Sequence, residues 1–267
     1  MIRRFEHSQV YVPSAVMESD PAQCGLAPFQ EIFLQTKDTL KLHGWFFPSR
    51  RRSEWSDLVL LLLHGNAGNI CTRVGFYQAW LELGLNVFAF DYRGYGRSEG
   101  EPSEEGTYLD GEAAYDFLIA RGFAPEQIIL LGKSLGGGIA SELALRRRVG
   151  GVILQNTFTS VPDVGRELFP FLPIRLISRI KYDTVNKLPK IQVPILIMHS
   201  RGDEYIRFHH AERNFAAANE PKIFWEIHGS HNGVLEANRQ NYLQGLETFL
   251  ARFFSRAPAA RPSQGKI

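Results

Sequence analysis

One serine stands in a pattern suited to nucleophilic chemistry. Ser134 is the centre of Gly132-Lys133-Ser134-Leu135-Gly136, which follows an apolar run at 128–131 and precedes a helix-prone run at 139–146. G-x-S-x-G is informative in this strand–turn–helix context, because a sharp turn projects the hydroxyl above the sheet and leaves room only for small neighbours. The start of the following helix also favours negative charge nearby. We therefore expect Ser134 to be a nucleophile.

Two glycine-containing segments match phosphate-binding motifs only in part. Gly132-Lys133-Ser134 resembles the end of a P-loop, but that motif needs a glycine where Gln127 stands. Gly94-Tyr95-Gly96 resembles the start of a dinucleotide fingerprint, but Glu99 occupies the next glycine position and no helix is expected to begin there. Both motifs are rejected.

A serine hydroxyl needs a base to take its proton, and an open α/β sheet presents such groups at the carboxyl ends of later strands. His231 lies in a loop between the last predicted strand, 222–227, and the final helix, which is where this architecture carries its base. His228, closer to the strand, is the alternative and is expected to pack or cap. His7 and His43 lie in or near the N-terminal hairpin region, on the wrong side of the serine in chain order. His209 and His210 fall in a helix-prone run, and we expect them at the surface.

A carboxylate is needed to orient that base. Asp203 follows the predicted strand at 195–198, and Gly202 before it indicates a turn. Glu204 is the neighbouring rival, whereas Asp91 precedes the serine and is expected to cap a loop. The order Ser134, Asp203, His231 is the serine–acid–histidine order of the strand–turn–helix hydrolases.

Acyl transfer places negative charge on a carbonyl oxygen, and backbone N–H groups can stabilise it. The first expected donor is the N–H of Leu135, directly after the nucleophile. The second is expected in the loop His64-Gly65-Asn66-Ala67-Gly68-Asn69, after the run at 58–63. We predict the N–H of Asn66, with Ala67 as the alternative, and expect His64 to brace the loop.

The elements that must position these residues follow from hydrophobic periodicity. Two β-prone runs, 31–36 and 40–47, predict a hairpin at a sheet edge. Later runs are continuously apolar, as in strands covered on both faces: 58–63, 85–90, 128–131, 152–154 and 195–198. The segments between these runs have helical spacing. This pattern predicts an α/β fold with a mostly parallel sheet, an antiparallel N-terminal hairpin and helices on both faces.

One segment interrupts the alternation. Residues 156–192 contain four prolines, which limit helix length, and apolar surface is supplied by Phe158, Phe169, Phe171 and Leu172. This predicts either a short helical insertion that acts as a lid over the site or an ordinary crossover helix with long loops. We expect one domain over residues 1–256 and a disordered tail at 257–267, where Pro, Ala, Ser and Gly dominate.

Composition limits the function classes. The 30 Lys and Arg against 28 Asp and Glu give a formal charge of +2, which argues against a nucleic-acid partner. The longest aliphatic run has six residues, so we expect no integral membrane segment, and no secretory signal is visible. Only Cys24 and Cys71 occur, which favours a reducing, cytoplasmic compartment.

These residues together resemble the α/β-hydrolase superfamily, over roughly 33–254. More narrowly they are similar to the bud-emergence-type subgroup, related to abhydrolase-domain proteins that include protein depalmitoylases. The resemblance rests on the segments already quoted around 64–69, 132–136 and 203, together with Asp91–Gly100, Asn156-Thr157-Phe158 and Gly229-Ser230-His231-Asn232. It implies serine hydrolase chemistry on a small acyl ester or an acylated substrate, without metal or organic cofactor.

Two departures from the family accompany the resemblance. Arg207 stands where members often carry proline after the acid loop, and we expect no counterpart of the membrane anchor that several relatives place ahead of the domain. Three alternatives to an esterase or thioesterase stay open: a serine peptidase, a protein depalmitoylase and a non-catalytic binding protein on the same scaffold. The sequence leaves the acyl chain length and the oligomeric state undetermined.

Overall fold

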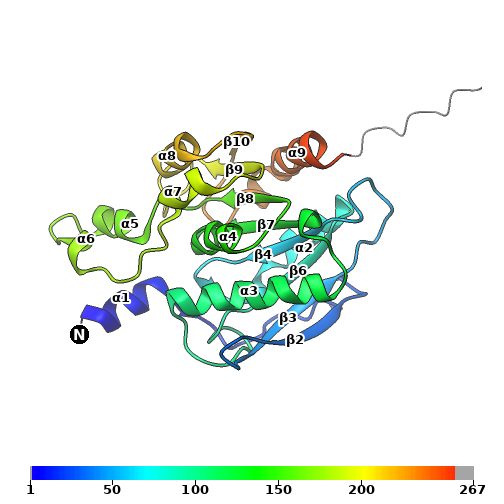
Figure 1. The fold of residues 1–267 in the computed structure, drawn as a ribbon, viewed down its shortest axis with the longest axis horizontal. Helices are drawn as coiled ribbons and strands as arrows, with labels where there is room; N and C mark the ends of the chain where they lie inside the picture. Colours follow the sequence, from blue (N-terminus) through cyan, green and yellow to red (C-terminus); the bar gives the residue numbers. More distant parts are fainter. Residues whose placement is uncertain (1, 256–267) are drawn as a thin grey trace, which may run out of the picture.

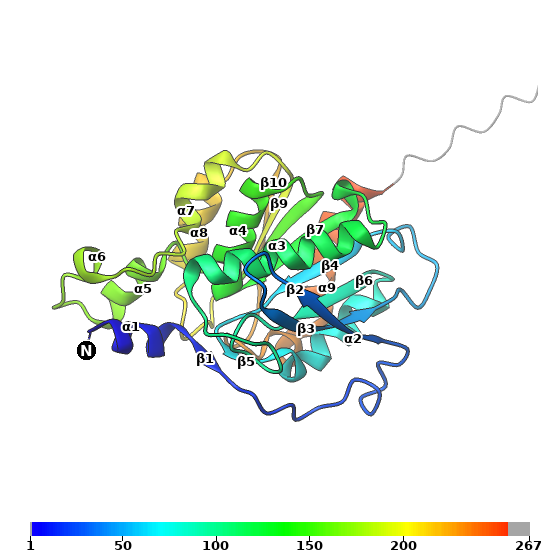
Figure 2. The same ribbon diagram turned by 60° about the horizontal axis from the view of Figure 1, so that its bottom comes forward.

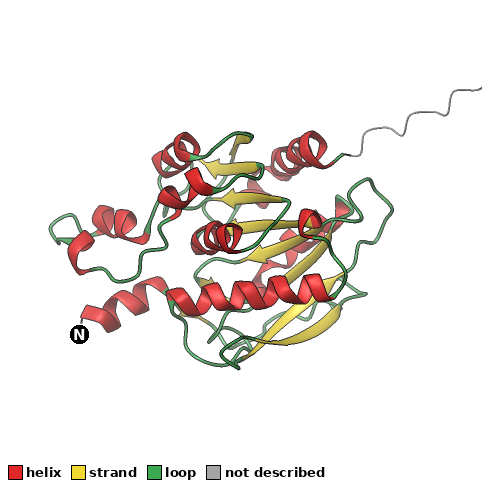
Figure 3. Cartoon of the chain, viewed as in Figure 1, coloured by secondary structure: helices red, strands yellow, loops and turns green. Residues whose placement is uncertain are grey.

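The apolar runs form one eight-stranded sheet, coloured yellow in Figure 3, in the order β10–β9–β8–β7–β4–β6–β3–β2. All neighbouring strands are parallel except β2–β3 and β3–β6. The computed structural model describes residues 2–255, so the predicted tail lies outside the described residues. The strands are β2 (Gln30–Gln35), β3 (Lys41–Phe47), β4 (Val59–Leu63), β6 (Asn86–Phe90), β7 (Ile128–Lys133), β8 (Gly151–Gln155), β9 (Ile195–Ser200) and β10 (Lys222–Ile227).

Each central strand is apolar throughout because it is covered on both faces. In β4, Val59, Leu61 and Leu63 join one buried cluster, whereas Leu60 and Leu62 join the other. This is the two-residue alternation of a strand with a core on each side. The predicted parallel sheet and edge hairpin are confirmed.

Helices cover both faces of the sheet (Figure 1). Buried side chains of α3 (Glu104–Ala120), α4 (Leu135–Arg146) and α8 (His209–Ala217) belong to the first cluster, and those of α2 (Val74–Glu82) and α9 (Val234–Phe254) belong to the second. Short 3₁₀ turns lie at Ile70–Arg73, Pro125–Gln127 and Leu188–Lys190. Across residues 2–255, every helix is too short or too polar to cross a bilayer.

The interval at 156–192 forms an insertion of short helices: α5 (Val161–Leu168), α6 (Ile174–Ile177) and α7 (Thr184–Lys187). Of the two expected forms, this is the helical insertion rather than one long crossover helix. The prolines explain its broken course, since Pro162 stands in the first turn of α5 and Pro173 directly precedes α6.

The first residues form elements that the sequence did not indicate. They are the helix α1 (Ile2–Val10) and the two-residue strand β1 (Val12–Pro13), which pairs in parallel with β5 (Ala67–Gly68). In Figures 1 and 2, α1 lies beside α5 and α6 at one end of the molecule. A nine-residue helix is marginal alone, so its stability comes from this packing.

Candidate active site

Ser134 occupies a sharp turn between β7 and α4. Its φ of 53° lies in the left-handed region, uncommon for a residue with a side chain, and is a mark of local strain. The flanking glycines are required by close backbone: a Cβ at Gly136 would overlap the Leu63 carbonyl oxygen, and one at Gly132 would lie 2.5 Å from the Gly136 oxygen. The turn thus has the geometry that the pentapeptide predicts.

Asp203 and His231 meet although 28 residues separate them. Nδ1 of His231 donates a hydrogen bond to Oδ2 of Asp203 at 2.7 Å, and both side chains are buried. The other carboxylate oxygen of Asp203 accepts the backbone N–H groups of Tyr205 and Ile206 at 2.9 and 2.8 Å, which fixes its orientation. An Nδ1–H tautomer leaves Nε2 of the imidazole as a proton acceptor.

Glu204, the rival carboxylate, has a different contact. Its Oε2 accepts the backbone N–H of His231 at 2.9 Å, so it holds the main chain and not the ring. Asn156 holds the same segment from the other side, because its amide donates to the His231 carbonyl oxygen at 3.2 Å. His228 is exposed and does not line the cavity described below.

Ser134 and His231 line the same cavity, of about 1050 Å³. Among residues 2–255, neither the Ser134 hydroxyl nor Nε2 of His231 has a hydrogen-bond partner, so both are available to a ligand. Leu135 and Asn66, the expected oxyanion donors, also line this cavity. Its other walls are largely apolar and come from α1 and the insertion: Phe5, Val10, Val161, Val164, Leu168, Phe169, Leu172, Ile174 and Ile177.

The loop after β4 is held on both sides of Asn66. Burial and the nearby Arg73 keep the pKa of His64 well below its ordinary value, and Nδ1 of this neutral ring donates to the Gly65 carbonyl oxygen at 2.7 Å. The Asn66 carbonyl oxygen accepts the N–H of Val12 at 3.0 Å and the hydroxyl of Tyr95 at 2.8 Å. Both peptide planes that adjoin Asn66 are therefore fixed, and His64 braces the loop as expected.

Two cationic side chains in the cavity wall were not identified from the sequence. Arg73 is nine-tenths buried and donates from Nη2 to the Ala67 carbonyl oxygen at 2.8 Å. Lys133 donates from Nζ to Oδ1 of Asn232 at 2.5 Å, and burial, with Arg73 nearby, lowers its pKa to about 7. Lys133 stands next to Ser134 in the pentapeptide, so the sequence could have indicated that it lies near the site. No motif in the sequence indicates this for Arg73.

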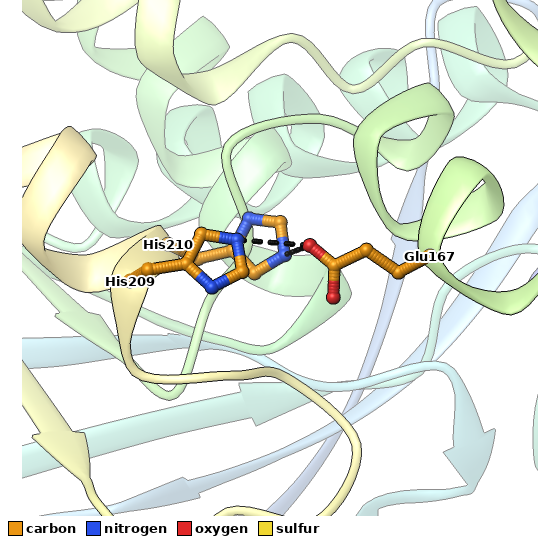
Figure 4. Close-up of side chains that lie close together, drawn as sticks. All are labelled: Glu167, His209 and His210. Atoms are coloured by element: carbon orange, nitrogen blue, oxygen red, sulfur yellow. Dashed lines mark ion pairs between the residues drawn. The ribbon is translucent and has the colours of Figure 1, made fainter. Parts of the chain in front are cut away.

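His210 corrects one expectation: it is fully buried, not at the surface. It starts α8 beside His209, and both Nε2 atoms lie close to Oε1 of Glu167 on α5, at 3.1 Å for His210 and 2.9 Å for His209 (Figure 4). Within the described residues this is the one trio of potential metal ligands. Nδ1 of His210 is held by Thr159, whose backbone nitrogen and hydroxyl oxygen lie 3.2 and 2.9 Å away. The charges around the trio fit a metal poorly.

Arginines further disfavour a cation there. Nε of Arg207 lies 3.6 Å from the second oxygen of Glu167. Arg175 and Arg213 lie beside Asp163, the nearest other carboxylate, at 2.9 and 3.1 Å. The trio is better described as a polar contact that fastens α5 to α8, and Arg207 adds an ion pair with Glu167 to it.

Comparisons with known proteins agree with this fold. A family model described as alpha/beta hydrolase fold matches residues 59–176. The chain is 33% identical over 244 residues to an uncharacterised protein of Mycobacterium tuberculosis, covering 90% of this chain and 85% of that protein. It is 33% identical over 239 residues to the Arabidopsis thaliana alpha/beta hydrolase domain-containing protein WAV2, covering 80% and 76%. The Pyrococcus furiosus esterase Pf2001 superposes with a TM-score of 0.74 at 20% identity, over 92% of this chain and 98% of the esterase.

Proposed function

The chain belongs to the α/β-hydrolase superfamily and to the subgroup of abhydrolase-domain proteins that its motifs resemble, and from this premise we propose that it is a serine hydrolase of carboxylic esters or thioesters. The observation that carries the proposal is the 2.7 Å contact between Asp203 and His231 at the cavity that also holds Ser134. A buried carboxylate that holds the Nδ1–H of an imidazole makes Nε2 the base.

The first half of the reaction forms an acyl-enzyme. Ser134 Oγ attacks the substrate carbonyl carbon while its proton passes to Nε2 of His231, and these two atoms come within hydrogen-bond distance when substrate is bound. The N–H groups of Leu135 and Asn66 donate to the oxyanion of the tetrahedral intermediate. The intermediate collapses, the bond to the leaving group breaks, and His231 returns its proton to the leaving alcohol or thiol.

The second half releases the acid. A water molecule gives its proton to His231 and adds to the acyl carbon, and the Ser134–acyl bond then breaks as the proton returns to Oγ. Asp203 stays ionised and stabilises the imidazolium in both halves. Each step needs only side chains and amides of this chain, so the proposal includes no metal and no organic cofactor.

The apolar lining of the cavity favours a substrate with an acyl chain over a polar substrate. Its walls beyond Ser134 come from α1, α5 and α6 and are mainly aliphatic or phenylalanine side chains, which favour an acyl chain. This also keeps a thioesterase acting on acylated proteins within the proposal. A peptidase would need donors for a peptide backbone along the cleft, and the aliphatic walls supply few.

Replacement of the nucleophile tests the proposal. Ser134→Ala is expected to abolish hydrolysis of a short p-nitrophenyl ester and labelling by a fluorophosphonate. Ser178→Ala is the matched control, because Ser178 lines the same cavity and should keep the label. Labelling that persists in Ser134→Ala would identify another nucleophile, and absence of any labelling in the folded wild type would favour a binding protein. A chain-length series of esters and thioesters, with aminoacyl amides beside them, then separates the alternatives.

A further inference from the structure

Apolar side chains are exposed together beside the cavity. The mouth surface, as we name it, consists of Phe5 on α1 and Leu168, Phe171, Leu172 and Leu176 on the insertion. Phe171 is 98% exposed and Leu176 87%. Single exposed apolar residues are ordinary, but four within nine residues of chain, joined by a fifth from another helix, indicate a surface that meets an apolar partner.

The mouth surface continues into the cavity. Phe5, Leu168 and Leu172 are exposed to solvent and also line the cavity that holds Ser134. They therefore lie at its opening. A partner seated on this surface would face the entrance to the site.

The two segments that carry this surface, α1 and the insertion, are distant in sequence but lie side by side (Figure 2). The ring of Phe5 packs edge-on against Phe169, with centroids 5.8 Å apart. The carboxylate of Glu6 accepts the backbone N–H of Arg179 at 2.9 Å. The apolar side chains are thus presented by a fixed backbone.

The two segments that carry these apolar side chains have an excess of positive charge. Residues 2–10 and 161–181 carry six Lys and Arg against three Asp and Glu, a formal excess of +3, whereas the whole chain has +2. The three acidic groups already have partners: Glu6 on the insertion backbone, Asp163 on Arg175, and Glu167 on the histidines of α8. Within the described residues, four exposed arginines here have no ion pair: Arg3, Arg4, Arg166 and Arg179.

We propose that the mouth surface docks on a lipid bilayer that contains anionic phospholipids. Phe171, Leu176 and their neighbours enter the boundary between headgroups and acyl chains, and the arginines contact lipid phosphates. Long arginine side chains suit this position, because the stem stays in the apolar layer while the guanidinium reaches the headgroups. Lipid phosphates supply the negative charge that this part of the chain lacks.

Docking would place the cavity opening against the membrane. An acyl chain could then pass from the bilayer to Ser134 without crossing water. This transfer of an acyl chain rests on the proposed function, but docking does not. An experiment can therefore contradict docking without contradicting the proposed hydrolase activity, and the reverse.

Vesicle binding by the full chain tests docking. The probe is vesicles of phosphatidylcholine and phosphatidylglycerol in equal amounts, with pure phosphatidylcholine vesicles for comparison. The wild type is expected to cosediment with the anionic vesicles, more weakly at high salt, and more weakly with the neutral ones. Phe171→Ser/Leu176→Ser should lower the affinity at least about tenfold, because each side chain loses its burial in lipid.

Matched controls make the result decisive. Phe33→Ser/Leu145→Ser removes the same residue types at exposed positions on β2 and α4, away from the mouth surface, and should bind as the wild type does. Ser134→Ala should also bind normally, which separates docking from catalysis. Phe171 and Leu176 do not line the cavity, so their double variant should hydrolyse a water-soluble short ester at the wild-type rate.

Three outcomes would overturn the proposal. The first is a wild type that does not bind anionic vesicles. The second is equal loss of binding in the Phe33/Leu145 control. The third is a concentration-dependent dimer that the Phe171/Leu176 variant abolishes while vesicle binding is unchanged, which would assign the surface to a second copy of the chain.

Discussion

Glu6 accepts a hydrogen bond from the hydroxyl of Ser178 at 2.6 Å, across 172 residues of sequence. The same carboxylate accepts the backbone N–H groups of Arg179 and Ile180. One side chain of α1 therefore anchors the end of the insertion, and the wall of the cavity depends on a contact between the beginning and the middle of the chain.

Loss of this anchor should loosen the insertion. Glu6→Ala removes three hydrogen bonds to a partly exposed carboxylate, and we expect about fivefold faster trypsin cleavage at Arg175 and Arg179, corresponding to about 1 kcal/mol of local stability. Limited proteolysis under native conditions measures it. Glu18→Ala, at an exposed position outside this contact, is the control. An unchanged cleavage rate in Glu6→Ala would show that the insertion is held by its apolar contacts alone.

The two neighbouring carboxylates of the acid loop should differ sharply in their effect on catalysis. Asp203→Asn cannot stabilise the imidazolium or the productive tautomer of His231, and kcat for a short ester should fall about 10³- to 10⁴-fold. Glu204→Gln keeps an oxygen acceptor for the backbone N–H of His231, so the change should stay within about fivefold. Steady-state kinetics of both variants measure this. A larger loss in the Glu204 variant would reverse the assignment of the acid.

Lys133 should make stability depend on pH. Its pKa is lowered to about 7 in the folded protein from the ordinary 10.5, so between these values the unfolded chain binds the extra proton. Between pH 7 and 10.5 the free energy of unfolding should therefore rise with pH, by up to about 1.4 kcal/mol per unit. Below pH 7 both states bind the proton, so this group should cause no further change with pH.

Lys133→Met removes that contribution. Urea unfolding at pH 6 to 9 should show a difference between the wild type and this variant that shifts in favour of the wild type as pH rises. Lys190→Met, at an exposed position, should keep the wild-type profile. Parallel profiles for the wild type and Lys133→Met would mean that Lys133 titrates as an exposed lysine does.

The sheet could be predicted because its residues carry the information locally. Runs such as 59–63 and 195–198 are apolar at every position, and only a strand covered on both faces needs this. The meeting of Asp203 and His231 could be anticipated from chain order for a related reason: parallel strands bring their carboxyl ends to one edge, so loops after successive strands become neighbours.

The remaining features depend on contacts between distant segments. Neither α1 nor β1 has a strong pattern of its own, and both are stabilised by the insertion and by the loop at 66–68. His210 was expected at the surface because its helix is polar, yet Glu167 from the insertion covers it. The burial of Arg73 also depends on distant segments, since its guanidinium is enclosed only when the cavity has folded.

The fixed loop after β4 has a consequence for the rate of the proposed reaction. A planar trans peptide points its N–H opposite to its carbonyl, so the bond from His64 to the Gly65 oxygen also sets the direction of the Asn66 N–H. In the proposed reaction, an N–H that is held in place before charge develops on the substrate needs no reorientation at that moment. The free energy of aligning it is supplied once, during folding, and does not recur with each turnover.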